Sequence, residues 1–226
     1  VIIKDINPPL KKMPPEFKKF QVDPNMVVQN AWPTVEAYVS AMRTKYRQRY
    51  QSTMKKSAAI SMQKLNLTQI AVHKAEINTL LAQVVKQDKF NLERIPEDYF
   101  MRLAGMPQFS LYGYFLDDRL VGFRSSLDAS DRLIAHYVGF DGAVNAEQKI
   151  YQRMLFDYVA EGIEKKLPAI HLGRTALEIK STVGAEREDH FLLFHSDNWF
   201  YRTVGNYYVG RLAATEYEAR SPFRDE

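Results

Sequence analysis

Cysteine is absent from the 226 residues, and long apolar runs are absent too. Without cysteine the chain can form no disulfide, no zinc–thiolate site and no cysteine nucleophile, which fits the reducing cytoplasm. No apolar run approaches the roughly 20 residues of a membrane-spanning helix, so we expect no membrane span. The opening residues, VIIKDINPPL, contain neither an initiator methionine nor a signal-peptide pattern. We therefore expect Val1 to lie inside a longer protein.

Acidic residues are missing from a long segment in the first third of the chain. No Asp or Glu occurs between Glu36 and Glu76, and residues 1–56 carry eleven Lys or Arg against four Asp or Glu, a net charge of +7. A field of one sign attracts an anionic partner, so we expect an anionic ligand near Arg43, Arg47 and Arg49. RNA, a lipid-linked diphosphate and a membrane surface remain open as its source, and so does a merely solvated helix face.

Hydrophobic periodicity predicts an alternation of strands and helices. The proline-rich stretch that ends near Pro24 predicts an irregular connection, since proline lacks a backbone donor. Apolar residues at three-to-four spacing predict long helices, and alternating runs split by Asp-rich turns predict an antiparallel meander. The predicted strands are 1–6, 58–67, 109–116, 119–127, 132–140, 169–173 and 189–195, and the predicted helices are 34–57, 68–89, 96–106 and 146–166. Strands flanked by helices indicate a mixed α/β sheet with the central helix, 146–166, packed on it.

The segment HLGRTALEIKSTVGA at 171–185 follows the predicted central helix and a short strand. It resembles the G-x-(T)-x-x-x-x-K-x-x-x-G segment of FemAB-like and related bacterial acetyltransferase domains. The order of elements from residue 58 likewise resembles the GNAT acyltransferase fold. The matching residues are Gly173, Arg174, Thr175, Glu178, Lys180 and Gly184.

This resemblance implies an organisation and an activity. Residues 57–215 are expected to be a complete GNAT-like acyltransferase domain, residues 1–56 the tail of a preceding lobe with its basic helix, and residues 216–226 a frayed tail. The implied reaction is transfer of an acetyl-like acyl group to an amine by direct attack, as in N-acyltransferases. Two alternatives stay open: a FemAB-like aminoacyltransferase that uses aminoacyl-tRNA on a cell-wall precursor, and a catalytically degenerate GNAT-fold binding module.

One departure concerns the donor. Typical GNAT enzymes have an R/Q-x-x-G-x-G/A loop before the central helix, whose backbone donors hold the pyrophosphate of coenzyme A. Here that region reads FDGAVNAEQKIYQRM, with Gly142 as its one glycine and no arginine before it. The pyrophosphate loop is therefore incomplete, and acyl-CoA and aminoacyl-tRNA both remain candidate donors. No metal is expected, because His190 and His195 have no third group with which to form a ligand set.

The candidate catalytic residues are Lys180 and Tyr137. A lysine just beyond a strand end can stabilise an oxyanion or bind a donor phosphate, although a lysine in such a loop is commonly an ordinary surface residue. Tyr137 and its neighbour His136 are predicted on opposite faces of one strand, so that one of them faces the cleft and the other packs in the core. The candidate donor-binding or substrate-binding residues are Gly173, Arg174, Thr175, Glu178, Tyr151 and Arg153; for Arg174 and Glu178, a mutual salt bridge is the alternative.

Overall fold

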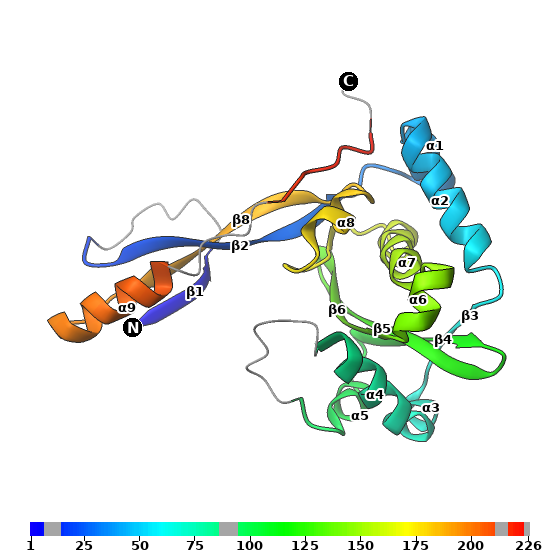
Figure 1. Cartoon of the computed structure of the whole chain (residues 1–226), viewed down its shortest axis with the longest axis horizontal. Coiled ribbons are helices and arrows are strands. Elements are labelled where there is room, and N and C mark those ends of the chain that lie inside the picture. Colours follow the sequence, from blue (N-terminus) through cyan, green and yellow to red (C-terminus); the bar gives the residue numbers. More distant parts are fainter. Residues whose placement is uncertain (7–14, 86–94, 211–216, 224–226) are drawn as a thin grey trace.

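The computed structural model describes residues 1–6, 15–85, 95–210 and 217–223. These residues form a mixed eight-stranded sheet in the order β1-β8-β2-β7-β6-β5-β4-β3, with helices on both of its faces (Figure 1). The strands are β1 (Ile2–Ile6), β2 (Lys18–Gln29), β3 (Ser61–Lys64), β4 (Phe109–Leu116), β5 (Arg119–Ala129), β6 (Arg132–Phe140), β7 (Ala169–His171) and β8 (Glu186–Phe194). The helices are α1 (Val35–Ala41), α2 (Thr44–Lys56), α3 (Leu67–Val72), α4 (Lys74–Val85), α5 (Tyr99–Leu103), α6 (Gly142–Gln148), α7 (Ile150–Glu164), α8 (Leu177–Ser181) and α9 (Trp199–Gly210).

The predicted meander is confirmed, and so is the mixed α/β class. Strands β4, β5 and β6 pair antiparallel in sequence order, and β3 adds to β4. The ends of β4 and β6 coincide with the alternating runs FSLYGYFL and RLIAHYVGF. Strand β7 then joins β6 in parallel after the α7 crossover.

The central helix lies on one face of the sheet, as predicted. Helix α7 shares a hydrophobic core with α1, α2, β6 and β7, whereas α3, α4 and α5 form a second core on β4 and β5. The predicted helix is not continuous: it begins early, at Gly142, and divides at Lys149, which has a left-handed backbone with φ 57°. Asp141 caps α6 by accepting hydrogen bonds from the amides of Ala143 and Val144.

The prediction of an irregular connection is wrong over Lys18–Gln29. These residues form β2, which lies inside the sheet between β8 and β7. The register with β8 shifts between Val22 and Asn25, so Pro24 sits in a bulge. A bulge is one of the few places where a strand tolerates proline, because the missing amide is not required there.

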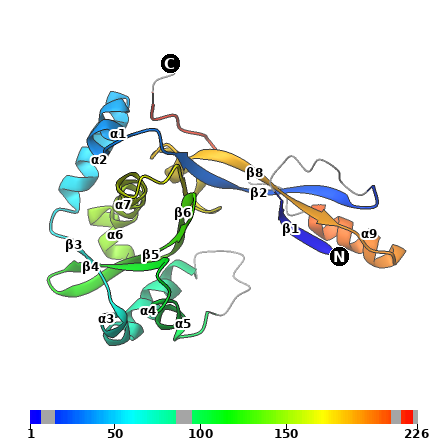
Figure 2. The same cartoon turned by 180° about the vertical axis from the view of Figure 1, so that it is seen from behind.

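Three strands and a helix extend away from the rest of the molecule as an arm. The arm consists of β1, the outer halves of β2 and β8, and α9 (Figures 1 and 2). Strand β1, at the predicted strand 1–6, is at the edge of the sheet beside β8. Helix α9 was not predicted, and among the described residues no helix is long and apolar enough to cross a membrane.

Residues expected to lie outside the GNAT-like domain pack onto it. Helices α1 and α2 are separate because Met42 leaves the helix and forms a β-bridge with Phe223. Residues 217–223, expected to fray, run back over the domain: the Pro222 carbonyl accepts from the Arg43 amide at 2.8 Å, and Phe223 packs on Trp32. The expected boundary after residue 56 therefore does not divide the core, because β2, α1 and α2 contribute to it. A lobe before Val1 stays a prediction.

Candidate active site

The candidate site lies where β6 and β7 separate. Their parallel pairing covers three positions, from Arg132 and Ala169 to Ile134 and His171. Beyond His171 the chain follows β2 instead, since Leu172 donates its amide to the Met26 carbonyl at 2.7 Å. The second half of β6 and the segment after β7 are therefore not paired with each other, and we call the place where they part the opening. Functional groups gather where strands of α/β sheets end and part.

On the β6 side, a β-bulge reverses one expectation. Arg124 pairs with Val138 and Ser126 with Ala135, so Ser125 alone faces both His136 and Tyr137. The rings of these two residues lie 4.5 Å apart, and both contact Tyr99 of α5. The prediction that they occupy opposite faces is therefore wrong, because the extra residue of a bulge resets the alternation. His136 and Tyr137 both face α5.

His136 accepts or donates hydrogen bonds at both ring nitrogens. Tyr99 Oη is 3.0 Å from Nε2, and Ser125 Oγ is 3.2 Å from Nδ1. Burial lowers the pKa of His136 to about 4, because desolvation disfavours the charged imidazolium. The ring is consequently neutral at pH 7 and linked to two hydroxyl groups.

The bulge is held from the opposite face of the sheet by α7. Tyr158 donates its hydroxyl to the Ser125 carbonyl at 2.8 Å and lies 3.4 Å from the Tyr137 carbonyl. The Arg124 guanidinium lies over the Tyr158 ring, 4.7 Å from its centroid, and forms a buried ion pair with Glu161. We predicted no role for Arg124, Tyr158 or Glu161; the one available signal was an arginine in the middle of the apolar run RLVGFRSSL.

Lys180 is on the other side of the opening, and it is not the ordinary surface lysine that was the alternative. It belongs to α8 and is only 4% exposed. A Cβ added to Gly173 would lie 3.7 Å from Lys180 Nζ, so the ammonium stands beside the glycine where the chain leaves β7. Gly173 has φ +81°, a backbone conformation that glycine adopts without strain. The first glycine and the lysine of the 171–185 segment therefore meet in space.

The other predicted members of this segment have different partners. Arg174 pairs with Asp5 of β1, not with Glu178. Glu178 accepts instead from Arg220 at 2.8 Å. The predicted mutual salt bridge is therefore wrong. Thr175 is exposed at the surface. Arg174 remains close in sequence to Gly173, but its charge is compensated by Asp5.

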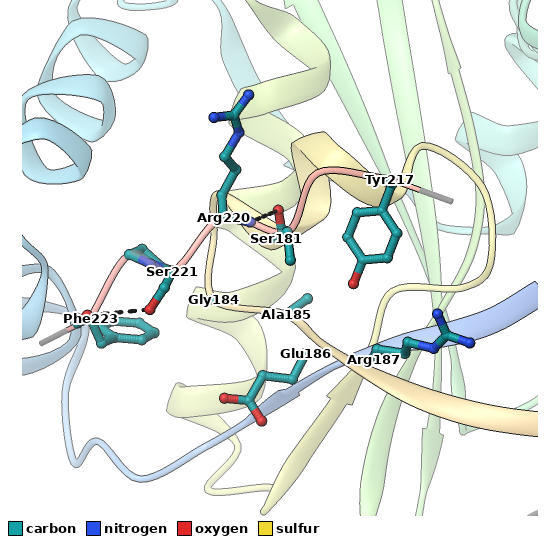
Figure 3. A pocket seen from close by; sticks show the side chains of 11 residues that line it. Ser181, Gly184, Ala185, Glu186, Arg187, Tyr217, Arg220, Ser221 and Phe223 are labelled. Atoms are coloured by element: carbon teal, nitrogen blue, oxygen red, sulfur yellow. Dashed lines mark hydrogen bonds between the residues drawn. The ribbon is translucent and has the colours of Figure 1, made fainter. Parts of the chain in front are cut away.

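The second glycine of the segment receives an aromatic ring. Gly184 has φ +90°, and a Cβ there would overlap the Phe223 ring. Residues 217–223 thereby hold the end of α8: Arg220 donates its amide to Ser181 Oγ at 3.0 Å. Between this segment and β8 lies an open pocket of about 650 Å³, into which Tyr217 points from one side (Figure 3). Neither Lys180 nor any residue of β6 lines this pocket.

At the start of α7, the predicted donor-binding residues make internal contacts. Arg153 forms an ion pair with Asp157 at 2.9 Å and donates to Ser57 Oγ at 3.2 Å. Tyr151 stacks on Phe140 with ring centroids 5.4 Å apart, and burial raises its pKa. The amide of Tyr151 donates to Asn145 Oδ1 at 3.0 Å.

The hydrogen bond between the Tyr151 amide and Asn145 is relevant to the binding of coenzyme A. In enzymes with a complete loop, the amides at this helix start receive the pyrophosphate. Here α6 replaces the loop, and Asn145 already occupies one of those amides. The residues present therefore do not reproduce that cradle. Among the described residues, no group of three or more His, Cys, Asp or Glu side chains is arranged to hold a metal ion.

Comparison with known proteins places the chain in a family. The family model described as an acetyltransferase (GNAT) domain matches residues 44–182. No curated protein matches the chain.

Solved structures share the fold at low sequence identity. FemX has a TM-score of 0.61 at 9% identity, over 84% of this chain and 68% of its own. L-PGS from Bacillus licheniformis has a TM-score of 0.55 at 12% identity, over 89% and 68%. The C-terminal domain of a putative lysylphosphatidylglycerol synthetase from Agrobacterium fabrum has 0.55 at 9% identity, over 80% of this chain and 62% of its own, so the present chain spans less than two thirds of that structure. The family model covers more than half of the chain, and this chain belongs to the GNAT acetyltransferase domain family.

Proposed function

We propose that this chain transfers an acyl group to an amine, with the donor carbonyl beside Lys180 and the acceptor amine beside His136. The observation that carries the proposal is the buried Lys180, whose Nζ stands at Gly173 where β6 and β7 separate. Lysine is almost never fully buried unless it is paired, so burial sets Lys180 apart from the exposed lysines of the chain. Negative charge develops on the carbonyl oxygen during acyl transfer, and a preorganised cation stabilises it.

The proposed reaction is direct. The amine nitrogen attacks the donor carbonyl carbon, and the carbonyl oxygen takes up negative charge near Lys180. The bond to the leaving group then breaks, and the amine loses a proton. That proton goes to the departing group, which leaves with the electron pair of the broken bond, while the neutral His136 ring, linked to Tyr99 and Ser125, orients the attacking amine. Tyr137 stays a candidate because its ring lies on the same side of β6.

Gly173 and its neighbours are proposed to bind the donor for different reasons. Gly173 offers close backbone approach at the opening, because it has no side chain. Arg174, Thr175 and Glu178 flank it and are proposed to meet the more distant parts of the donor. For Arg174 and Glu178 this would require exchange of the partners Asp5 and Arg220. Tyr151 and Arg153 are proposed to act only by fixing the start of α7.

A second candidate is aminoacyl transfer from aminoacyl-tRNA. The observation that favours it is the α7 start, where α6 and Asn145 take the place of the pyrophosphate cradle. A donor that does not present a pyrophosphate there has no need of the cradle. The FemX fold is compatible with this candidate.

The test compares donors by thermal unfolding. The protein is melted alone, with acetyl-CoA and with an aminoacyl-tRNA, and each donor that shifts the transition is then assayed for transfer to a panel of amines. A donor at 100 times its Kd adds about 2.7 kcal/mol to stability, which raises the midpoint by several degrees. Binding of a donor followed by amine acylation supports the proposal. Stabilisation by neither donor would contradict it and favour a binding module.

A further inference from the structure

The exposed face of α2 is a basic stripe with no acidic residue on the helix. Lys45, Arg49 and Lys56, separated by four and seven positions, lie along one line of a helix with 3.6 residues per turn, and Lys55 lies beside them. Three glutamine or serine side chains lie beside them. The members of this stripe are Lys45, Gln48, Arg49, Gln51, Ser52, Lys55 and Lys56, and all are exposed.

The charges of the stripe are not neutralised within the described residues. No ion pair involves Lys45, Arg49, Lys55 or Lys56 among the residues that the structure describes, although Lys45 and Arg49 lie near the Tyr46 ring. Arg43 and Arg47, which we predicted as ligand-binding, differ: both are partly buried, and Arg47 donates to the Ser40 carbonyl. Of the three predicted arginines, only Arg49 belongs to the stripe.

Helix stability does not account for the whole pattern. Lys55 and Lys56 lie in the last turn, where the helix dipole favours cations. Lys45 lies in the first turn, where cations are unfavourable, and that turn contains no acid. The helix dipole therefore gives no reason for a cation at Lys45.

We propose that this stripe binds the phosphate backbone of folded RNA. A membrane surface fits less well, because interfacial helices insert an apolar face, whereas the apolar side of α2 is already packed through Tyr46, Tyr50 and Met54. Single-stranded binding needs exposed aromatic rings for stacking, and the stripe has none. Lysine, arginine, glutamine and serine side chains all form hydrogen bonds to phosphate oxygens.

The test measures binding of a fluorescent RNA hairpin across a range of salt concentrations. The variant Lys45→Gln/Arg49→Gln/Lys56→Gln is compared with Lys4→Gln/Lys18→Gln/Lys19→Gln, which removes the same charge from exposed positions on the arm. We expect the stripe variant to bind at least tenfold more weakly at low salt. Its log–log salt slope should fall by about 0.9 for each duplex phosphate that the variant no longer neutralises, or somewhat less on single strands. The arm variant should retain both properties.

A parallel measurement uses vesicles containing an anionic lipid. Equal affinity and equal salt slope for the two variants on RNA would overturn the proposal. Stripe-dependent binding to the vesicles without binding to RNA would also overturn it, and would assign the surface to a membrane. Unchanged circular dichroism and midpoints of both variants establish that folding is not the cause.

Discussion

At the scale of residues, the 171–185 segment contains two glycines, and each of them allows another side chain to come close to the backbone. Gly173 admits the Lys180 ammonium, and Gly184 admits the Phe223 ring. The sequence resemblance identified both glycines, but it did not say what they face. Gly184 and Phe223 are too far apart in the chain for any local periodicity to connect them.

The close approach at Gly184 gives a stability prediction. We expect Gly184→Ala to lower the free energy of unfolding by about 1–3 kcal/mol, because the methyl group overpacks against Phe223 and a left-handed backbone disfavours alanine. Gly105→Ala is the matched control, since an added Cβ there has no atom within 4 Å. Urea unfolding of both variants checks the difference. Equal stability would mean that Phe223 does not pack on Gly184 in solution.

His136 gives a pH prediction. Its folded pKa, about 4, is below the ordinary value of 6.5. Between these two values the unfolded chain binds a proton that the folded protein does not, so stability falls as pH is lowered through this window. In His136→Gln this component is absent, and we expect a shallower loss of stability between pH 7 and pH 5. A loss equal to that of the unaltered protein would show that His136 titrates normally.

At the scale of elements, the sequence anticipated those whose patterns are local. The runs 109–116 and 132–140 are rich in aromatic and branched apolar residues, and they form β4 and β6. Strand β2 was not predicted because Pro24 lies within it. The bulge that accommodates this proline depends on the register with β8, which the local sequence does not reveal. The division of the central helix at Lys149 and the bulge at His136 also depend on contacts made in the folded sheet, which no local pattern encodes.

The buried ion pair between β5 and α7 gives an element-scale prediction. Arg124 and Glu161 are 1% and 5% exposed. Removing one partner leaves a buried charge uncompensated, so Glu161→Gln should cost about 3–5 kcal/mol. Asp131→Asn breaks an exposed pair with Arg132, and should cost less than about 1 kcal/mol. Denaturant unfolding of the two variants measures the contrast, and similar small losses would argue against burial of the pair.

At the scale of the whole molecule, the chain combines a GNAT domain with an arm of β1, the outer halves of β2 and β8, and α9 (Figure 2). The candidate site uses both sides of one opening: His136 on β6, and Gly173 with Lys180 after β7. Lys180 and Gly173 were predicted by resemblance. The position of His136 beside Tyr99 was not, because it requires the bulge and the docking of α5 onto the sheet.

The most direct test of this account is the acyl-transfer rate of Lys180→Met, measured with the donor and amine that the wild-type protein uses. Methionine keeps most of the aliphatic bulk and removes the charge, so we expect a folded protein whose turnover is lower by about a hundredfold or more. Lys64→Met, at an exposed position on β3, should retain wild-type turnover. Full activity in folded Lys180→Met would contradict the assignment of the reaction to the opening between β6 and β7.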